Sequence, residues 1–341
     1  MSVKTFAAID VGSFELTMKI FDFSGKNTMR EIDCIHQRID LGSDTYANGK
    51  ISNEKMDDLC HTLKEFSQIM ESYKVIAYKA YGTSAIRETE NTLILQDQIE
   101  QRTGIRVEIL SNSEQRFLDY KSIASKGETF RRIIEEKTAI LDIGGGSIQI
   151  SLFDKDTLVS TQNLRLGVLR LQELLNHLNA GSTQMEQLVD ELATAQLDDY
   201  KKLYLKDREI KNIIIVDDYL SPWAVRKAHE RGDGNAMVDS KAFYQLMEAL
   251  RTRGTTELAK RMDIAEEKVP LVYISAVLTK RIAELMGAAL IWAPGVTLCD
   301  GIAYEYAEQN KLLRGEHDFA EDIIACAMNI SKRYNGSTRR A

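Results

Sequence analysis

The sequence contains few residues that interrupt helices or bind metal ions. Three prolines among 341 residues leave room for long, uninterrupted helices. Four cysteines and five histidines are scattered without the spacing of metal ligands, which argues against a zinc site and against a histidine-centred catalytic triad. We therefore expect reduced, mostly structural thiols.

Long apolar runs and an excess of positive charge are also missing. No apolar run approaches the length of a membrane span, and the first residues lack the basic-then-apolar pattern of a signal peptide. These absences predict a cytoplasmic protein without a membrane segment. The net charge of −7 argues against bulk binding of nucleic acid. The length indicates two domains, and it leaves open whether the chain forms a homodimer.

Two short glycine-containing segments each lie between two runs of strand-forming residues. They are residues 142–147 (DIGGGS) and residues 10–13 (DVGS). Glycine leaves backbone N–H groups accessible, so such a turn suits an anion such as phosphate. A hairpin turn that only tolerates glycine is the alternative. The presence of two similar turns favours phosphate binding.

Each glycine segment opens a similar order of predicted elements. Asp142 follows Asp10 by 142 − 10 = 132 residues, about the length of one such unit. We predict an α/β protein of the actin-like ATPase (RNase H-like) fold class, in which two βββαβαβα units face each other across a cleft. The expected domains are 1–125 and 126–299, and a helix of about 300–312 could pack back on the first. Residues 313–341 are predicted to form a polar tail, the remnant of a helical domain, with one amphipathic set at Phe319, Ile323, Cys326 and Ile330.

Within these units the periodicity of apolar residues predicts individual elements. Ser52 is expected to cap a long helix, and Gly104 to end another. The predicted strands cover about 3–40 as a three-stranded meander, then 75–81, 105–110, 137–143, 148–154, 157–165, 213–216 and 288–292. The remaining predicted helices cover about 91–102, 111–124, 167–179, 183–205, a helical stretch over 240–286 and a last helix from 300.

The order of several short motifs resembles that of one known family. The motifs are DVGS (10–13), GTSAIRETEN (82–91), SNSEQ (111–115), DIGGGS (142–147), RLGVLRL (165–171) and LCDGIAYEYA (298–307). Over residues 3–312 the chain resembles the exopolyphosphatase / guanosine pentaphosphate phosphohydrolase (Ppx/GppA) phosphatases. The resemblance implies removal of terminal phosphate from inorganic polyphosphate or pppGpp, usually with magnesium. Polyphosphate or a guanosine alarmone is thus the expected ligand.

The expected site uses the two turns and one arginine. Asp10 and Asp142 would hold a hydrated Mg²⁺, although both could instead form Asx turns. Arg87 would offer a fork of donors, although it could instead pair with Glu88 or Glu90 on the surface. Arg165 and Arg170 are weaker candidates, and for Arg170 a solvated surface position is expected. The backbone donors to phosphate are predicted to be Gly12, Ser13, Gly144, Gly145, Gly146 and Ser147.

Two positions depart from the family pattern in a way that weakens catalysis. The pattern implies a glutamate as the base that activates water, but the chain has Gln115 there, preceded by Glu114. Glu114 could be occupied by a capping box with Ser111. A second expected glutamate is Gln149. The predicted catalytic residues are therefore Glu114, Gln115 and Asp142, with Gln115 able to orient water but not to accept its proton.

Other departures add to this prediction. Phe14 replaces a residue expected to donate to phosphate, and the pair 217–218 (DD) replaces a glycine turn. Its charges should repel a phosphate and argue against a nucleotide-dependent kinase. Residues 317–334 resemble the start of an HD-like helical domain that longer family members carry, so the chain is interpreted as a short form. We expect weak hydrolysis, or alternatively a degenerate member that binds its anion as a regulator or partner.

Overall fold

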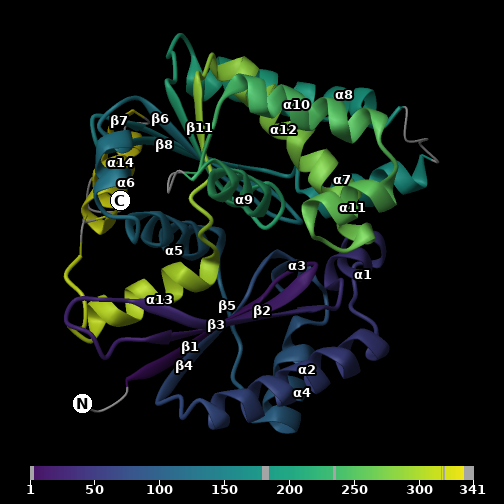
Figure 1. Ribbon diagram of the computed structural model, residues 1–341, viewed down its shortest axis with the longest axis vertical. Coiled ribbons are helices and arrows are strands. Elements are labelled where there is room, and N and C mark those ends of the chain that lie inside the picture. The colour runs from purple at the N-terminus through teal and green to yellow at the C-terminus, as the bar shows by residue number, and fades with distance from the viewer. Residues whose placement is uncertain (1–3, 179–183, 233–235, 316, 318, 334–341) are drawn as a thin grey trace.

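The computed structural model describes residues 4–178, 184–232, 236–315, 317 and 319–333. It has two sheets, each covered by helices, and Figure 1 shows the first below the second. The end of the tail, residues 334–341, lies outside the described residues. Within the described ranges, no helix combines the length and the apolar character that crossing a bilayer requires.

The first sheet contains the predicted meander and two parallel strands. Its order is β3-β2-β1-β4-β5, with β1 antiparallel to β2 and parallel to β4. The strand predicted over 105–110 is shorter than expected. The elements are β1 (Thr5–Val11), β2 (Glu15–Asp22), β3 (Arg30–Arg38), α1 (Leu41–Asn48), α2 (Asn53–Ser72), β4 (Ala77–Gly82), α3 (Ser84–Glu88), α4 (Thr92–Thr103), β5 (Glu108–Ile109), α5 (Asn112–Ala124) and α6 (Glu128–Ile134).

The second sheet repeats this order and adds one strand, β10, at one edge. Its order is β10-β11-β9-β6-β7-β8. The predicted helical stretch over 240–286 is divided among three α-helices, and the predicted helix 183–205 ends in a π-helical turn, Lys201–Leu205. The elements are β6 (Thr138–Ile143), β7 (Ile148–Asp154), β8 (Thr157–Leu164), α7 (Val168–His177), α8 (Met185–Tyr200), β9 (Asn212–Val216), α9 (Ser221–Arg231), β10 (Met237–Val238), α10 (Ser240–Thr252), α11 (Thr255–Met262), α12 (Val269–Met286) and β11 (Leu290–Trp292).

Alternation along β1 explains why the first sheet is covered on both faces. Ala7, Ile9 and Val11 pack in one apolar cluster with α2 and α4, whereas Phe6 and Ala8 pack in another with the last helix of this region, α13 (Leu298–Gln309). Successive strand residues point to opposite faces, so alternate residues of β1 pack against α2 and α4 on one face and against α13 on the other. The predicted caps hold: the Ser52 side chain accepts from the N–H of Lys55, and Gly104 ends α4 at φ 70°.

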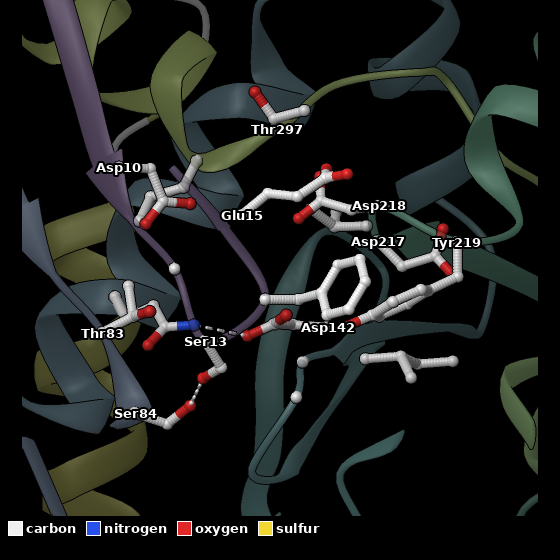
Figure 2. A pocket seen from close by; sticks show the side chains of 18 of the residues that line it. Asp10, Ser13, Glu15, Thr83, Ser84, Asp142, Asp217, Asp218, Tyr219 and Thr297 are labelled. Carbon is white, nitrogen blue, oxygen red and sulfur yellow. Dashed lines mark hydrogen bonds between the residues drawn. The ribbon is translucent and has the colours of Figure 1, made fainter. Parts of the chain in front are cut away.

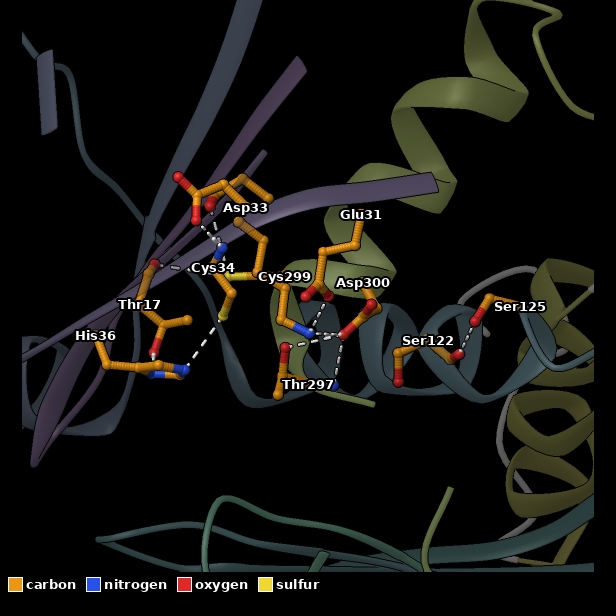
Figure 3. A network of polar contacts seen from close by, with 12 residues as sticks. Thr17, Glu31, Asp33, Cys34, His36, Ser122, Ser125, Thr297, Cys299 and Asp300 are labelled. Carbon is orange, nitrogen blue, oxygen red and sulfur yellow. Dashed lines mark hydrogen bonds and ion pairs between the residues drawn. The ribbon is translucent and has the colours of Figure 1, made fainter. Parts of the chain in front are cut away.

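Helix α13 is tied to the first sheet by a buried ion pair. The Lys19 amine on β2 lies 2.9 Å from Asp300 and 2.9 Å from Glu31 (Figure 3). Asp300 also accepts from the N–H and the hydroxyl of Thr297, which caps the helix. Gly301 allows α13 to lie against α5, because a Cβ there would stand 1.9 Å from the Leu118 carbonyl oxygen.

The region predicted as a polar tail contains a packed helix. Helix α14 (Phe319–Arg333) places Phe319 and Cys326 in an apolar cluster with Phe130 and Tyr120. Figure 1 shows it beside β6–β8 and α6 of the second sheet. The predicted tail thus contains a helix, and two members of its predicted amphipathic set, Phe319 and Cys326, are buried.

Candidate functional site

The two glycine turns have the same backbone geometry. The Gly12 N–H donates to the Glu15 carbonyl at 3.1 Å, and the Gly144 N–H donates to the Ser147 carbonyl at 3.0 Å. Each turn joins two antiparallel strands, β1 to β2 and β6 to β7. Both aspartates, Asp10 and Asp142, lie two residues before the turn's glycine. The equivalence predicted from sequence therefore holds at the level of hydrogen bonds.

A small cavity of about 70 Å³ lies where the two turns meet. Figure 2 shows Asp10 and Ser13 approaching it from the first domain and Asp142, Asp217 and Asp218 from the second. Both sides thus contribute carboxylates and turn backbone. Its lining includes Asp10, Gly12, Ser13, Phe14, Glu15, Gln115, Asp119, Asp142, Gly144, Gly145, Asp217, Asp218, Tyr219 and Lys268.

The Asp142 carboxylate accepts hydrogen bonds from the two amides that occupy the expected glutamate positions. Its Oδ2 accepts from Gln115 Nε2 at 3.1 Å and from Gln149 Nε2 at 3.0 Å. The Gln115 Oε1 accepts in turn from Arg87 Nη1 at 3.3 Å. An amide can make these bonds with a carboxylate, whereas an ionised glutamate could not. The two replacements therefore stabilise Asp142 instead of merely removing charge.

Arg87 reaches this network from α3 but does not line the cavity. Its Nη1 also donates to the Leu110 carbonyl at 2.7 Å, and burial lowers the pKa of its guanidinium. Neither Glu88 nor Glu90 takes it as a surface partner: Glu88 instead pairs with Arg165 and Arg170, and Glu90 pairs with Lys50. Arg87 thus positions Gln115 in this structure.

Glu114 lies outside the cavity, although it was a catalytic candidate. Its carboxylate accepts from the Ser111 N–H at 2.8 Å, and the Ser111 hydroxyl accepts from the Glu114 N–H at 3.2 Å. These two bonds form the capping box of α5 and lower the pKa of Glu114. The capping-box alternative is confirmed: the Glu114 carboxylate caps the N-terminus of α5.

The middle of the second glycine turn serves packing more than anion access. Gly146 and Ser147 do not line the cavity, and a Cβ on Gly146 would stand 2.5 Å from the Tyr46 hydroxyl. The first N–H groups of α7 donate to the turn, from Val168 to the Gly144 carbonyl at 3.1 Å and from Leu169 to the Gly145 carbonyl at 3.0 Å. The carbonyl groups of the turn therefore accept hydrogen bonds from the free N–H groups at the N-terminus of α7.

Arg170 is not solvated, contrary to the prediction. Its side chain is 22% exposed, its Nε donates to the Gly146 carbonyl at 2.9 Å, and its guanidinium lies over the Tyr46 ring at 4.5 Å. It also pairs with Glu88 of the first domain at 2.6 Å. Arg170 thus holds the glycine turn against the first domain. Periodicity alone could not show this contact, because its partners are distant in sequence.

Asp119 is a cavity residue that the sequence analysis missed. It lies one helical turn after Gln115 on α5, so both face the cavity. It is 3% exposed, and its Oδ2 has no hydrogen-bond partner among the described residues. Its position four residues after Gln115 on a predicted helix could have indicated that both side chains lie on the same face.

Burial makes ionisation of the cavity carboxylates unfavourable. Burial raises the pKa of Asp10 well above its usual range, and the charges of Asp218 and Asp142 raise it further. Burial likewise raises the pKa of Asp142 to about 6, against hydrogen bonds from Asp119 and Gln149 that lower it. Burial raises the pKa of Asp119 well above its usual range, and the neighbouring Asp142 raises it further. A bound cation would relieve this repulsion.

The two aspartates after β9 have different roles. Asp217 accepts from the N–H groups of Leu220 at 2.9 Å and Ser221 at 2.8 Å, so it caps the start of α9. Burial raises the pKa of Asp218, and Lys268 lowers it. Lys268 pairs with Glu15 at 2.8 Å and so joins the two domains beside the cavity. Repulsion of phosphate is thus expected from Asp218 more than from Asp217.

Solved structures with similar folds share this arrangement of domains. An exopolyphosphatase structure from Cytophaga hutchinsonii superposes with a TM-score of 0.74 at 19% identity, covering 91% of this chain and 100% of that one. At this identity the likeness shows the fold alone. The actin-like fold predicted from the sequence is confirmed.

Sequence comparison identifies the family. The chain is 23% identical over 210 residues to a bifunctional 3-dehydroquinate synthase/phosphatase of Fusobacterium nucleatum, covering 58% of this chain and 31% of that protein. It is 27% identical over 144 residues to exopolyphosphatase 1 of Mycobacterium bovis, covering 42% of this chain and 40% of that protein. The chain thus spans less than half the length of these relatives. A profile of the Ppx/GppA phosphatase family matches residues 22–309, and the chain belongs to that family.

Proposed function

We propose that the chain binds the terminal phosphate of a phosphoanhydride in the cavity between its two glycine turns and hydrolyses it slowly. The observation that carries this proposal is the placement of Asp10 and Asp142, on equivalent turns of the two domains, at one cavity with turn backbone beside them. Inorganic polyphosphate and pppGpp are the ligands proposed, in line with the relatives described as exopolyphosphatases.

The cavity residues fit a divalent cation bound together with the ligand. Asp10 Oδ1 is buried without a hydrogen-bond partner, and the pKa of Asp10 is raised, so a cation is a suitable partner for it. Among the described residues, no three histidine, cysteine or acidic side chains already form a metal shell. Mg²⁺ needs only one or two carboxylates when water and phosphate complete its shell. Asp10 and Asp142 would hold it, and it would neutralise charge on the phosphate oxygens.

The chain's own groups would position the reacting atoms. The backbone of Gly12, Ser13, Gly144 and Gly145 borders the space for phosphate oxygens. Gln115, held by Arg87 and Asp142, presents an amide that orients a water molecule but cannot take its proton. Loss of a general base typically slows a reaction about 10²- to 10⁴-fold. Slow hydrolysis follows, because phosphoryl transfer depends mainly on positioning and charge neutralisation.

Binding without turnover is the second candidate function. It is favoured by the two amides on Asp142, which satisfy that carboxylate without any ligand, and by Asp218 at the cavity. In this case the chain would act as a polyphosphate- or alarmone-binding regulator. The two candidates share the ligand and differ only in chemistry.

Phosphate release from polyphosphate and from pppGpp, measured with Mg²⁺, separates these candidates. We expect slow release by the wild type, release at least about tenfold faster by Gln115→Glu because a base is restored, and no release by Asp142→Asn. Gln101→Glu, on the exposed side of α4, makes the same chemical change away from the cavity and should match the wild type. If wild type and Gln115→Glu both bind ligand but release no phosphate, the hydrolase proposal fails and the binding candidate remains.

A further inference from the structure

A second cavity of about 310 Å³ lies between α9, α10 and α11 of the second domain. Figure 1 shows these helices in the upper half of the molecule. One face of α9 supplies Trp223, Arg226, Lys227 and Arg231, which recur at helical spacing. The facing helices supply further cationic and apolar side chains. The cavity is therefore built from several elements instead of one exposed helix.

The walls of this cavity are strongly basic in an acidic protein. Five cations line it, three on α9 together with Lys241 on α10 and Arg261 on α11. Asp239 is the acidic side chain among the lining residues, and its Oδ1 accepts from the Ala242 N–H at 2.7 Å as the cap of α10. The chain as a whole has a net charge of −7. The cavity is thus positively charged although the chain as a whole has a negative net charge.

Three of the five cations lack an ion pair with a carboxylate among the described residues. Lys227 pairs with Glu230 at 2.5 Å, and Glu230 also interacts electrostatically with Arg226 and Arg261. In the described part of the chain, no ion pair joins Arg226, Lys241 or Arg261 to a carboxylate within 4 Å. The Arg226 Nε is buried and has no hydrogen-bond partner there. A buried guanidinium donor without an acceptor points to a ligand that supplies one.

The floor of the cavity strengthens an electrostatic interaction. It includes the apolar side chains of Trp223, Leu246, Leu258 and Met262, each at most 8% exposed. Apolar walls lower the effective dielectric, so charges above them interact more strongly than at an open surface. Arginine forks and lysine amines match the geometry of phosphate oxygens.

From these observations we infer a second anion-binding site, which takes a multiply charged phosphate chain. It goes beyond the proposed function, because it requires no chemistry at the glycine turns. Arg226 also lines a neighbouring cavity of about 650 Å³, which shares Lys268, Asp218 and Thr297 with the cavity between the turns. Arg226 thus lies between the second site and a cavity that borders the first.

Calorimetric titration with inorganic tripolyphosphate tests this site, without divalent metal and in the Asp142→Asn background to silence the first cavity. The test variant is Lys241→Gln/Arg261→Gln, which removes two exposed cations of the site. The matched control is Lys64→Gln/Lys260→Gln, two exposed cations that do not line it. We expect at least about tenfold weaker binding by the test variant and a shallower dependence on salt. The control should bind as the Asp142→Asn protein does.

Two further ligands identify what the site recognises. GTP carries the same triphosphate on a nucleoside. Tighter binding of GTP would show that the site recognises a nucleotide. Tighter binding of tripolyphosphate would show that it recognises an inorganic polymer. Both results support a phosphate-chain site. Equal affinity in the test variant and the control would overturn it, as would an equally strong, equally variant-sensitive interaction with a single-stranded oligonucleotide. Circular dichroism melting confirms that each variant is folded.

Discussion

The two glycine turns share a backbone but differ in what surrounds their aspartates. Asp142 accepts hydrogen bonds from Gln115 and Gln149, whereas Asp10 Oδ1 is buried without a partner. The residue paired with Asp142 across β7 is Gln149, and the residue paired with Asp10 across β2 is Thr17, whose hydroxyl instead contacts His36. The protein thus supplies hydrogen-bond donors to Asp142, whereas Asp10 Oδ1 has no partner within the protein.

Under the proposed function, this difference separates the binding of phosphate from its hydrolysis. The turns retain the geometry that brings two carboxylates and their backbone to one cavity. The residues that would supply a base have become donors to Asp142. The predictions below test whether the two turns act together despite this difference.

The largest effect is expected when either aspartate loses its charge. Asp10→Asn and Asp142→Asn should each slow metal-dependent phosphate release by about a hundredfold or more, because a bound metal supplies several kcal/mol of charge stabilisation. A colorimetric phosphate assay measures the rates. Loss of activity in only one variant would show that the turns do not form a single site.

Alanine at the first glycine of each turn should distinguish the turns by stability. An added Cβ at Gly12 would stand 2.6 Å from the Glu15 carbonyl oxygen, and at Gly144 3.4 Å from that of Ser147. We expect Gly12→Ala to destabilise by about 1–3 kcal/mol and Gly144→Ala by less than about 1 kcal/mol. Urea unfolding measures both. Equal losses would contradict the difference in turn packing.

Restoring a carboxylate beside Asp142 should destabilise the metal-free protein. Gln149 is 2% exposed, so Gln149→Glu removes a buried hydrogen bond and adds a like charge, at a cost of about 1–2 kcal/mol near pH 8. Gln115 is less buried, and Gln115→Glu should cost less. Thermal melting in chelator, repeated with Mg²⁺, is the measurement. A stability loss that Mg²⁺ does not reduce would argue against a cation at this cavity.

The smallest effect is a pH dependence. Asp10 and Asp142 have folded-state pKa values above their unfolded values, so the folded chain binds more protons. Metal-free stability should therefore fall as the pH rises from about 4, the unfolded pKa of aspartate, through about 6, the folded pKa of Asp142. Asp10→Asn should flatten this fall in melting temperature. An unchanged pH profile would mean that Asp10 is ionised without penalty.

Local sequence signals predicted much of the fold and of the turns. Apolar alternation, the Ser52 cap, the Gly104 stop and the two matched glycine segments depend on residues close in sequence. The short helices α1 and α6 and the edge strand β10 were missed, because a few residues carry too little periodicity. The tail was predicted to be the remnant of a helical domain, but the contacts of α14 with Tyr120 and Phe130 were not predicted, because these residues are far away in sequence.

The part of the site that was predicted also depends on residues close in sequence. Asp10, Gly12, Ser13, Gln115, Asp142, Gly144 and Gly145 meet at one cavity because turn and strand register place them there. Asp119, Lys268 and the contact of Arg170 with Gly146 depend on how α5, α7 and the loop before α12 pack. Tertiary contacts of this kind leave no short-range pattern in the sequence.

In the proposed function, the two turns together hold one cation and the phosphate. Binding of Mn²⁺ in the presence of pyrophosphate, followed by electron paramagnetic resonance, tests it in wild type, Asp10→Asn, Asp142→Asn and the double variant. We predict that either single change weakens binding at least about tenfold and that the double variant is little worse than either, since coupled residues give non-additive effects. Additive losses, or unchanged binding in one single variant, would contradict the claim.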